Sequence, residues 1–463
     1  MKGIKNNITQ KDCHRVLLYT SISRLFRTTL VGHLYEIAQV YPVVLLSEKL
    51  DTETEKILHN KELFPKLEKI IPIRQQRGGM KGLLAKYNYH RYLCRLSKNV
   101  VEEYRPDIVI MSDDFTVISR YLIRFARKIK AMTICFQASF RMEIKRIGLW
   151  SDLMNMSQKN FPSFFPFWLK MKLVRIRKYL SHFFEYYLLP LIVGQASLGI
   201  KSSYIIWSKR EVGMYADYYI VFSKRDYNLS LQEGVPIEKL YILNHPLEHK
   251  NTRRFFKEAY SLNSLSENVK DRKVLTIMLP SVNLGFRKNN YSLISEEQIT
   301  KNRKEAIILI TKTLKDWQIF IKPHPQTDQS LYETFFSFKS ISSNIKICDI
   351  QEPADKYIEI SDVVLGFPPC STTLFIASLQ SQEKVILSLN LQNELLGDFY
   401  RGFKGVEYID NRKKFIRVLE KIRDNKYTKH NRKPDLNKFS NAVNILRYLS
   451  RKESIVESSE DTI

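Results

Sequence analysis

The sequence predicts an α/β protein of two domains that face a central cleft, each built around a parallel sheet. Short apolar runs alternate with segments of helical periodicity along most of the chain, the pattern of Rossmann-like strand–helix–strand units. A polar, charged stretch at residues 247–272 interrupts this alternation once, and the pattern then starts again. The length of 463 residues also exceeds what one typical core accommodates. We therefore expect a first domain over residues 1–246, a linker over 247–272 and a second domain over 273–449.

The first domain opens with a buried strand at residues 15–20, a helix at 28–40 and a second strand at 42–46. Arg24 and Arg27 follow the first strand, and the loops after parallel strands line the crevice of such a sheet. The two arginines are candidates for holding an anionic acceptor, although a solvated loop explains them equally well. Further strands are predicted within residues 63–73, 106–112, 132–137, 218–222 and 241–243, with helices at 88–104, 116–126 and 226–233.

Two adjacent acids, Asp113 and Asp114, end the apolar run of residues 106–112. A carboxylate at the end of a buried strand is placed to take a proton from an acceptor hydroxyl, so either acid is a candidate catalytic base. The alternative is that one of them caps the following helix while the other is solvated. The sequence gives these two interpretations equal weight.

The second domain begins with a strand at residues 274–279 and a helix at 296–314. The next strand, at 317–322, ends in Lys322 and leads into His324 between two prolines, so both side chains would lie at the carboxyl edge of the sheet. Further strands are predicted at residues 345–348, within 358–366 and at 384–389, followed by helices at 411–424 and 438–449 and a disordered tail at 450–463.

Ser371, Thr372 and Thr373 form the second signal in this domain. They follow Gly366 and two prolines and precede an apolar helix, which is the position of an N-cap. The free N–H groups and the positive dipole end of a helix start attract phosphate. Alone, such a cluster is usually only a cap. Together with His324 at the same edge of the sheet, it predicts a pocket for a nucleoside monophosphate or diphosphate.

These motifs resemble the C-terminal half of nucleotide-sugar glycosyltransferases of the GT-B fold. The resemblance rests on the His324 turn, the strand at residues 361–364 and the helix start at 371–373; it extends over 274–391 and more loosely over 16–246. It points to the His-Pro-bearing enzymes of bacterial surface polysaccharides, namely sialyl- and polysialyltransferases, capsule Kdo transferases and CDP-glycerol glycerophosphotransferases. It implies metal-independent transfer without a cofactor, with His324 catalytic and the donor phosphates held by Lys322, Ser371, Thr372 and Thr373.

The sequence departs from these families at several places, among them Gln137-Ala138-Ser139, where related sequences often have Gln-His-Gly. Many of the enzymes carry a Glu early in the helix after the Ser/Thr turn, which holds the donor ribose, but residues 374–378 contain no acid. The sialyltransferases carry an acid-acid-Gly motif for their base, and Phe115 stands where the Gly would be. The identity of the donor therefore stays open.

The leading interpretation is a glycosyltransferase that builds a bacterial capsule or another surface polysaccharide from a nucleotide-sugar donor and a glycan or lipid-linked acceptor. The alternative is a phosphotransferase using CDP-glycerol or CDP-ribitol, in which the same pocket serves attack on phosphorus. A non-catalytic, membrane-associated component of a polysaccharide synthesis complex is a third possibility. A nucleotide-sugar 2-epimerase is a weaker fourth, because the acid and histidine clusters of that class are not evident in the sequence.

The amino-acid composition limits the classes of partner that the protein is expected to bind. The formal net charge is +26, from 74 Lys and Arg against 48 Asp and Glu, which suits an anionic membrane surface, a polyanionic glycan or simply a solvated lysine-rich surface. Nucleic acid is not expected, because no zinc-finger, helix-turn-helix or RNP pattern occurs. The five cysteines are scattered and lack metal-ligand spacing, so we expect free thiols, a reducing compartment and no metal site.

Residues 141–207 break the strand–helix alternation and are expected to form a helical insertion in the first domain. An aromatic cluster at 161–168 is followed by an amphipathic segment with a basic face, the signature of interfacial membrane binding. A helical hairpin packed on its own domain is the alternative. The candidate membrane contacts are Phe164, Phe165, Trp168, Lys170 and Arg177.

The N-terminal residues contain no apolar core of a signal peptide, and the apolar run at 186–200 is shorter than the roughly 20 residues that a spanning helix needs. We therefore expect a cytoplasmic protein that is peripheral on the inner face of the cell membrane.

Overall fold

The computed structural model describes the chain with gaps. The described residues are 14–20, 31–74 apart from 49 and 51, 83–137 apart from 115, positions 176, 180, 183–184 and 188–193, 215–259 apart from 233, 272–280, and 285–460 apart from 287–292, 295, 326, 328–332, 334–335, 353, 369–372, 381–383, 393, 395–399, 402, 404 and 428–438.

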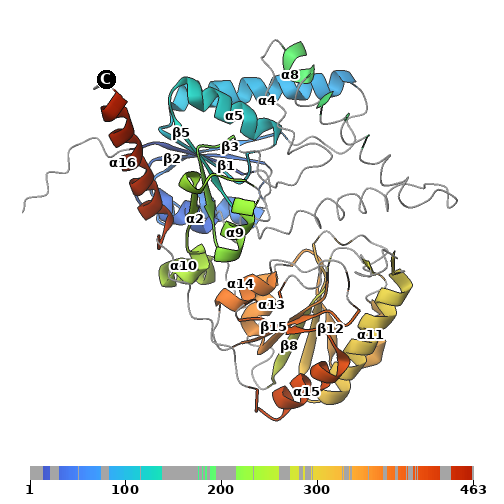
Figure 1. The fold of residues 1–463 in the computed structure, drawn as a ribbon. Helices are drawn as coiled ribbons and strands as arrows, with labels where there is room; N and C mark the ends of the chain where they lie inside the picture. Colours follow the sequence, from blue (N-terminus) through green and yellow to red (C-terminus); the bar gives the residue numbers. More distant parts are fainter. Residues whose placement is uncertain are drawn as a thin grey trace, which may run out of the picture. The chain divides into compact units, whose positions relative to one another are not determined.

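The chain forms two compact units (Figure 1). Unit 1 comprises Met1–Thr252 together with Asp435–Ile463, and unit 2 comprises Arg253–Pro434. Unit 1 is therefore made of two separate stretches of the chain, and unit 2 is inserted between them. The two-domain Rossmann-like architecture that the sequence predicts is confirmed.

Unit 1 is built on a seven-stranded sheet in the order β3-β2-β1-β4-β5-β6-β7. Every neighbouring pair of strands is parallel. The chain winds outward from β1 to β3 in one direction and from β4 to β7 in the other, so the topological switch point lies between β1 and β4. The strands are β1 Val16–Thr20, β2 Val43–Ser47, β3 Leu67–Pro72, β4 Ile108–Met111, β5 Met132–Phe136, β6 Tyr218–Val221 and β7 Leu240–Ile242.

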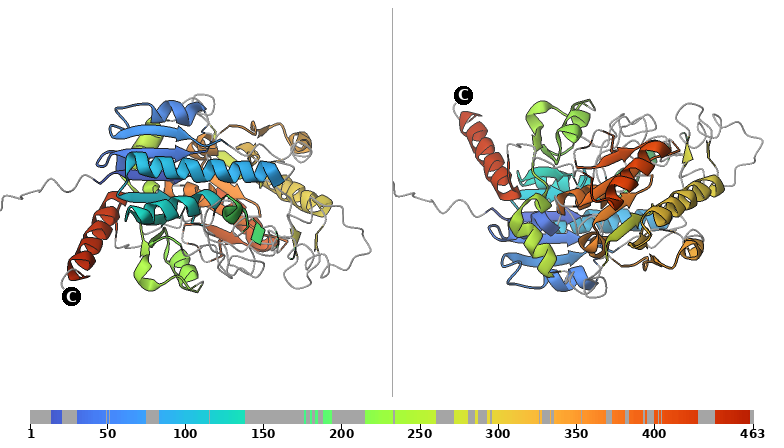
Figure 2. Two further views of the ribbon diagram at one scale, coloured as in Figure 1. Left: turned by 90° about the horizontal axis from the view of Figure 1, so that it is seen from above. Right: turned by 90° about the horizontal axis from the view of Figure 1, so that it is seen from below.

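Helices cover both faces of this sheet. The helices α4 (Leu83–Tyr104) and α5 (Val117–Lys128) lie side by side on one face, where their apolar residues bury Leu17, Tyr19 and Val109 (Figure 2). The helix α2 (Val31–Ala38) covers the opposite face, and α16 (Ala442–Glu460) packs on α2. Further α-helices in the described part of unit 1 are α3 Thr52–Leu58, α8 Leu189–Ile192, α9 Lys224–Gln232 and α10 Lys250–Ala259, of which the last crosses into unit 2.

Unit 2 repeats the same plan with a six-stranded parallel sheet in the order β12-β11-β8-β13-β14-β15. The chain winds from β8 to β12 on one side and from β13 to β15 on the other, so the switch point lies between β8 and β13. The strands are β8 Val274–Met278, β11 Gln318–Lys322, β12 Ile345–Ile347, β13 Val363–Gly366, β14 Val385–Leu389 and β15 Glu407–Ile409, with a separate hairpin of β9 Gly285–Phe286 and β10 Leu293–Ile294.

The core of unit 2 lies mainly between its sheet and two helices, α11 (Glu296–Thr313) and α15 (Arg412–Arg423). Alternate residues of the buried strands, such as Leu275 and Ile277, meet Ile307 and Ile310 of α11. On the opposite face, Tyr357 of α13 (Ala354–Ile360) packs on Phe320, and α14 (Thr373–Gln380) lies beside α13. Burial on both faces explains why these strands are continuous apolar runs.

The boundaries differ from the expected ones at three places. The helix α16 belongs to unit 1 and continues to Glu460, whereas the sequence assigned residues up to 449 to the second domain and predicted a disordered tail at 450–463. Its buried residues Ala442, Ile445 and Leu449 recur at helical spacing, so packing on α2 explains the helix. The helix α10 occupies part of the predicted linker. The helix α13 occupies residues that had been included in a strand.

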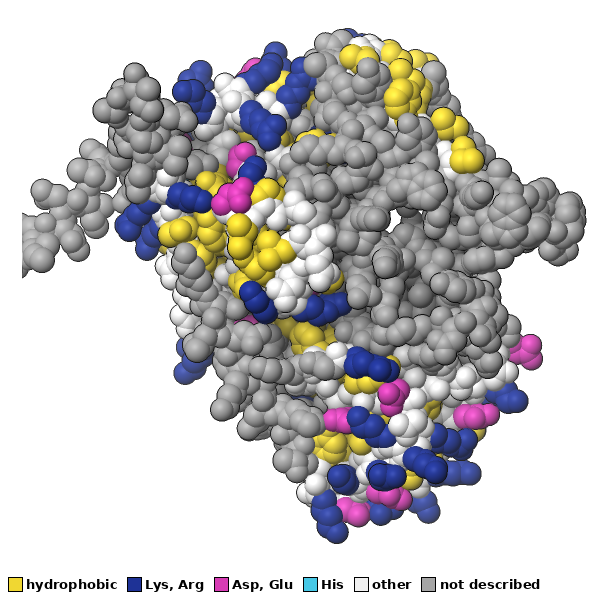
Figure 3. All heavy atoms as spheres, viewed as in Figure 1, with side chains coloured by type: hydrophobic (Ala, Val, Ile, Leu, Met, Phe, Trp, Pro, Cys, Tyr) yellow, Lys and Arg dark blue, Asp and Glu magenta, His cyan; other side chains and the backbone are white. Residues whose placement is uncertain are grey.

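The expected insertion lies largely outside the described residues, and the predicted membrane contacts Phe164, Phe165, Trp168, Lys170 and Arg177 are among those outside. Within the described positions, Leu189 and Pro190 of α8 are buried. By contrast, the side chains of Ile176, Leu180 and Ile192 are more than half exposed, at 53%, 59% and 57%. Hydrophobic side chains accordingly reach the surface near α8 (Figure 3).

None of the helices in the described part of the chain combines the length and the apolar character needed to span a bilayer. The three cysteines that the structure describes, Cys94, Cys135 and Cys348, are buried and form no disulfide.

Candidate functional site

The predicted donor-phosphate residues gather at one edge of unit 2. Met278 at the end of β8 is the register partner of Lys322 on β11 and also of Gly366 on β13, so the three strands end level with one another. His324 follows β11 and Thr373 begins α14 after β13. The two strands flank β8, which places them about 10 Å apart at the switch point where open α/β sheets bind ligands. The structure thus brings these two sequence-predicted positions to the same edge, with β8 between them.

Gly366 allows the close approach of β13 and α14. A Cβ atom at this position would lie 2.8 Å from Cδ1 of Leu374, so a larger residue would push the helix start away from the strand end. Thr373 is the first residue of α14, and Phe375 donates its backbone N–H to the hydroxyl of Tyr400 at 3.2 Å. Ser371 and Thr372 lie outside the described residues. The end of β13 and the first turn of α14 are therefore in close contact at Gly366 and Leu374.

Lys322 and His324 differ in exposure. Lys322 is only 2% exposed, and its amino group donates to the backbone carbonyls of Pro323 at 2.9 Å and Ile350 at 3.1 Å. Its ammonium group therefore already ties the end of β11 to the loop after β12. His324 is partly exposed and its carbonyl accepts the backbone N–H of Thr327 at 2.9 Å. Of the two, His324 is the side chain that solvent or a ligand reaches.

The equivalent edge of unit 1 carries Asp113 and Asp114, which follow β4 at the switch point between β1 and β4. Arg24 and Arg27, in the loop after β1, lie outside the described residues. Asp113 is 9% exposed, and one of its oxygens accepts the backbone N–H of Thr116 at 2.9 Å and the hydroxyl of Ser119 at 3.2 Å. Asp113 therefore supports the residues at the start of α5, although the N-cap position of that helix is Thr116 and has no side-chain cap hydrogen bond.

Asp114 is completely buried and accepts several hydrogen bonds. Its Oδ2 atom accepts the hydroxyl of Tyr219 and the backbone N–H groups of Tyr215, at 2.8 Å, and Ala216, at 3.4 Å. Burial and the charge of Asp114 raise the pKa of the Tyr219 hydroxyl, so this hydroxyl stays protonated and donates. The carboxylate thus anchors the point where the chain enters β6.

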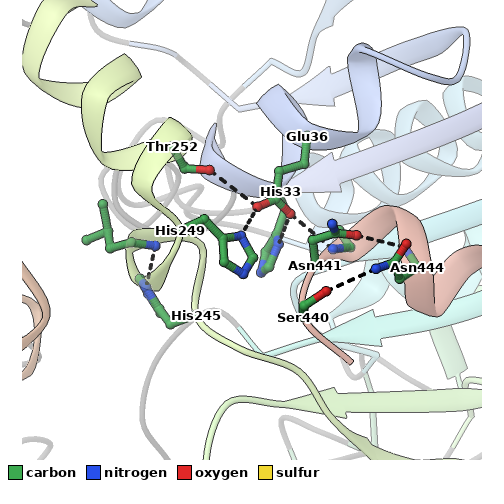
Figure 4. Close-up of polar contacts among 10 residues, drawn as sticks. His33, Glu36, His245, His249, Thr252, Ser440, Asn441 and Asn444 are labelled. Atoms are coloured by element: carbon green, nitrogen blue, oxygen red, sulfur yellow. Dashed lines mark hydrogen bonds and ion pairs between the residues drawn. The ribbon is translucent and has the colours of Figure 1, made fainter. Parts of the chain in front are cut away.

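A third polar cluster in unit 1 was not predicted from the sequence, and Glu36 is its centre (Figure 4). One carboxylate oxygen of Glu36 accepts hydrogen bonds from Nδ1 of His249 and, at 3.3 Å, from the hydroxyl of Thr252. The other accepts the backbone N–H of Ala442 at 3.0 Å and lies 3.8 Å from Nδ1 of His33. Glu36 therefore ties α2 both to the segment that leaves unit 1 and to the segment that returns to it.

Electrostatics in this cluster favour a charged pair. Burial alone would raise the pKa of Glu36, but the hydrogen bond from His249 and the nearby imidazole of His33 outweigh it and lower that pKa to about 2. Burial alone would lower the pKa of His249, but the hydrogen bond and charge of Glu36 outweigh it and raise that pKa. His33, fully buried, has its pKa lowered by desolvation, against the opposing effect of Glu36. These directions favour a Glu36 carboxylate paired with a protonated His249 beside a neutral His33.

A partial signal for this cluster was present in the sequence. His33 and Glu36 are three residues apart on one helix, and His245 and His249 flank the end of the first domain. The contact between Glu36 and His249 joins residues 213 apart, so no local pattern reveals it. His33 also stacks on Phe222 and meets the edge of Phe136, just after β6 and at the end of β5. Among the residues that the structure describes, no group of three or more His, Cys, Asp or Glu is arranged to hold a metal ion.

His249→Gln tests the charged pair. The amide can keep a hydrogen bond to Glu36 but loses the charge, so we expect the free energy of unfolding to fall by about 1 kcal/mol near pH 6. Because the folded-state pKa of His249 is raised, this loss is complete below about pH 6.5 and shrinks as pH rises through the folded-state pKa. Urea unfolding across this pH range measures it, and the exposed His59→Gln serves as the control. A deficit that does not change with pH contradicts the charged pair.

Comparison with known proteins supports the architecture. No protein-family model and no curated protein sequence matches the chain. The structure of UDP-GlcNAc 2-epimerase from Methanocaldococcus jannaschii is 13% identical with a TM-score of 0.54, over 94% of this chain and 99% of that one. UDP-GlcNAc 2-epimerase from Neisseria meningitidis, bound to UDP-GlcNAc, is 12% identical with a TM-score of 0.52, over 89% and 94%. At such identities the likeness shows the fold alone, and the chain has the two-domain, Rossmann-like GT-B fold.

Proposed function

We propose that this chain is a nucleotide-sugar-dependent glycosyltransferase of bacterial capsule or surface polysaccharide synthesis. The observation that carries the proposal is the level ending of β11 and β13 on either side of β8, with His324 and the start of α14 at one edge. A helix start at a topological switch point carries a positive dipole end, which suits the phosphates of a nucleotide. The sequence resemblance to His-Pro-bearing transferases names the class of reaction.

In this proposal the donor phosphates are held by His324, Ser371, Thr372 and Thr373. The amino group of Lys322 already donates to two backbone carbonyls. Lys322 therefore contributes its positive charge to the pocket and keeps the end of β11 in place. In the transfer step the acceptor hydroxyl oxygen attacks the anomeric carbon while the bond from that carbon to the nucleotide phosphate breaks. The nucleotide leaves with the electron pair, and protonated His324 together with the helix dipole stabilises its charge. The hydroxyl proton passes to the base.

Asp113 is the better candidate for that base in this proposal. It is 9% exposed and directly follows β4 at the switch point of the sheet. Asp114 is fully buried and its Oδ2 atom holds the entry to β6. Arg24 and Arg27 are proposed to bind the acceptor from the neighbouring loop.

A second candidate function is epimerisation of a nucleotide sugar at C2. The fold comparisons favour it, because the cited structures are described as UDP-GlcNAc 2-epimerases and one was solved with UDP-GlcNAc bound. It differs from transfer in one observable respect: an epimerase changes the sugar without an acceptor, whereas a transferase needs one.

Incubation with CMP-, CDP-, UDP- and GDP-activated donors, with and without a polysaccharide acceptor, tests the proposal. We expect one donor to release its nucleotide only when the acceptor is present. His324→Ala should weaken binding of that donor by about 1.5–3 kcal/mol, the range for a charge-assisted hydrogen bond. Conversion of UDP-GlcNAc to its C2 epimer without acceptor supports the second candidate instead. Release of the nucleotide from CDP-glycerol or CDP-ribitol identifies a polyol-phosphate transferase. If folded His324→Ala binds the donor as tightly as the wild type does, the assignment of His324 to the donor pocket is wrong.

Asp113→Asn separates the base from the cap. Asparagine keeps a side-chain oxygen that can accept the hydrogen bonds from Thr116 and Ser119, so α5 should remain intact. Turnover should nevertheless fall by about 10²–10⁴ with unchanged donor affinity if Asp113 is the base. Asp114→Asn should instead lower stability, because a buried charged acceptor for Tyr219 is lost. Full turnover in both variants would show that the acid pair is structural.

We also propose that the protein is cytoplasmic and docks on the inner face of the cell membrane. The exposed side chains of Ile176, Leu180 and Ile192 support this, since an apolar surface next to a basic sequence segment suits an anionic bilayer. Co-sedimentation with anionic liposomes should fall as salt rises but persist in part, because burial of the aromatic cluster is not screened.

The decisive variant changes the five cations of the insertion, Lys170, Lys172, Arg175, Arg177 and Lys178, to Gln. Its matched control removes five exposed cations on or beside α15 in unit 2, Arg412, Lys413, Arg417, Lys421 and Lys426. We expect only the first variant to lose binding to anionic vesicles. Equal loss in both, or equal binding of the wild type to neutral vesicles, is incompatible with docking through the insertion.

A further inference from the structure

A cavity of about 670 Å³ lies at the amino edge of the sheet in unit 1. Ile108, the first residue of β4, is the register partner of both Val16 on β1 and Met132 on β5, so the three strands begin level with one another here. Asp113 follows the other end of β4, which is about 13 Å long. The cavity is therefore separate from the edge of unit 1 that we propose for the acceptor.

The floor of this cavity is apolar. It consists of the buried lining residues Pro106, Ile108, Ala131 and Met132. The rim, by contrast, carries charged side chains from the ends of α4 and α5. A cavity of this volume, with an apolar floor and a few polar groups, has the character of a small-molecule site.

The two acids at the rim already have partners. Oδ2 of Asp107 accepts the backbone N–H of Arg15 at 2.8 Å and lies 4.0 Å from Nδ1 of His14. The carboxylate of Glu102 lies 3.8 Å from the amino group of Lys98, one turn earlier on α4. The negative charge at the rim is therefore offset in part by groups of the protein itself.

Two cations at the rim, Arg105 and Lys130, have no such partner. Within the part of the chain that the structure describes, neither side chain makes a hydrogen bond or an ion pair. Ser450 of α16 also lines the cavity, and its Oγ atom is buried without a hydrogen-bond partner. Two positive charges and one hydroxyl are thus available to a ligand.

Both cations stand where the backbone favours another residue. The φ angle is 40° at Arg105, directly after α4, and 57° at Lys130, just after the C-cap Ile129 of α5. Glycine or asparagine is usual at such left-handed positions after a helix, and Asn425 is found after α15 in unit 2. The dipole of a helix favours a cation at its end, but it does not explain why both cations line one cavity.

We infer that this cavity binds a small organic anion, whose phosphate or carboxylate group pairs with Arg105 and Lys130 and whose ring packs on the apolar floor. The planar guanidinium suits two oxygens of one anion, and the ammonium adds a second charge. The hydroxyl of Ser450 donates to the same ligand, so α16 contributes to the site. The inference is independent of the proposed transferase reaction.

The test uses UMP, N-acetylneuraminic acid and inorganic phosphate as probes on the full chain. Amide hydrogen exchange locates each probe: residues 101–108 and 126–132 report on the cavity, and residues 318–324 report on the donor site of unit 2. We expect UMP or N-acetylneuraminic acid to slow exchange in the first two segments. UMP identifies a phosphate ligand and N-acetylneuraminic acid a carboxylate ligand.

Arg105→Gly and Lys130→Gly separate the ligand from the fold. Each should weaken the protecting probe by at least about tenfold, because a charge-assisted hydrogen bond is lost. Glycine adopts the left-handed conformation without strain, so the urea midpoint should not fall. Asn425→Gly is the control for the backbone change, and Lys128→Gln removes an exposed cation of α5 outside the cavity lining. Neither control should change the affinity.

Three results overturn the inference. In the first, none of the probes slows exchange in residues 101–108 and 126–132, whatever happens in residues 318–324. In the second, inorganic phosphate protects these segments as well as the organic anions do, so the apolar floor plays no part. In the third, both glycine variants bind as tightly as the wild type, and the two cations then serve only the ends of their helices.

Discussion

Unit 1 consists of two separate stretches of the chain, and the carboxylate of Glu36 joins them. Glu36 lies on α2. It binds His249 and Thr252 of the segment that leads out of unit 1, and it binds Ala442 of the segment that returns to it. A parallel bridge from Leu243 to Phe439 joins the same two segments next to this point. Because the carboxylate is largely buried, each of these bonds acts in a medium of low dielectric, where an unpaired partner would be costly. One side chain thereby holds together parts of the chain that are far apart in sequence.

Buried polar groups perform a similar task at two other places. Asp114 holds Tyr215, Ala216 and Tyr219, which are the residues with which the chain re-enters the sheet after the insertion. In unit 2, the buried Arg303 of α11 pairs with Glu394 and donates to the carbonyl of Pro368, just after β13. In each case an apolar contact would supply burial, but a hydrogen-bonded charge also supplies direction. All three sites join a strand end or a helix start to an irregular segment, which is where secondary structure offers no backbone partners.

Much of the fold was predictable because parallel strands buried on both faces are continuous apolar runs. The strands around Leu17, Ile110, Ile277 and Leu387 were therefore identified, and the positions of His324 and Thr373 at one sheet edge followed from strand direction. Less could be said where tertiary contacts override local pattern. Ile358 and Ile360 read as strand residues, yet this stretch is a helix whose Tyr357 packs on Phe320. The polar composition of α10 concealed a helix, and the partners of Glu36 and Arg303 lie too far along the chain to be paired from spacing.

The return of α16 to unit 1 has a consequence for how the protein is made. A ribosome releases the chain from the N-terminus, so all strands of the first sheet emerge long before the residues that complete their unit. Until residues 439–449 are synthesised, α2 has no α16 to pack on, and Glu36 lacks the N–H of Ala442. The second unit has no such dependence and has its whole sequence available earlier. A premature stop codon near the end of the gene would therefore damage the part of the protein encoded first and leave the later-encoded unit 2 complete.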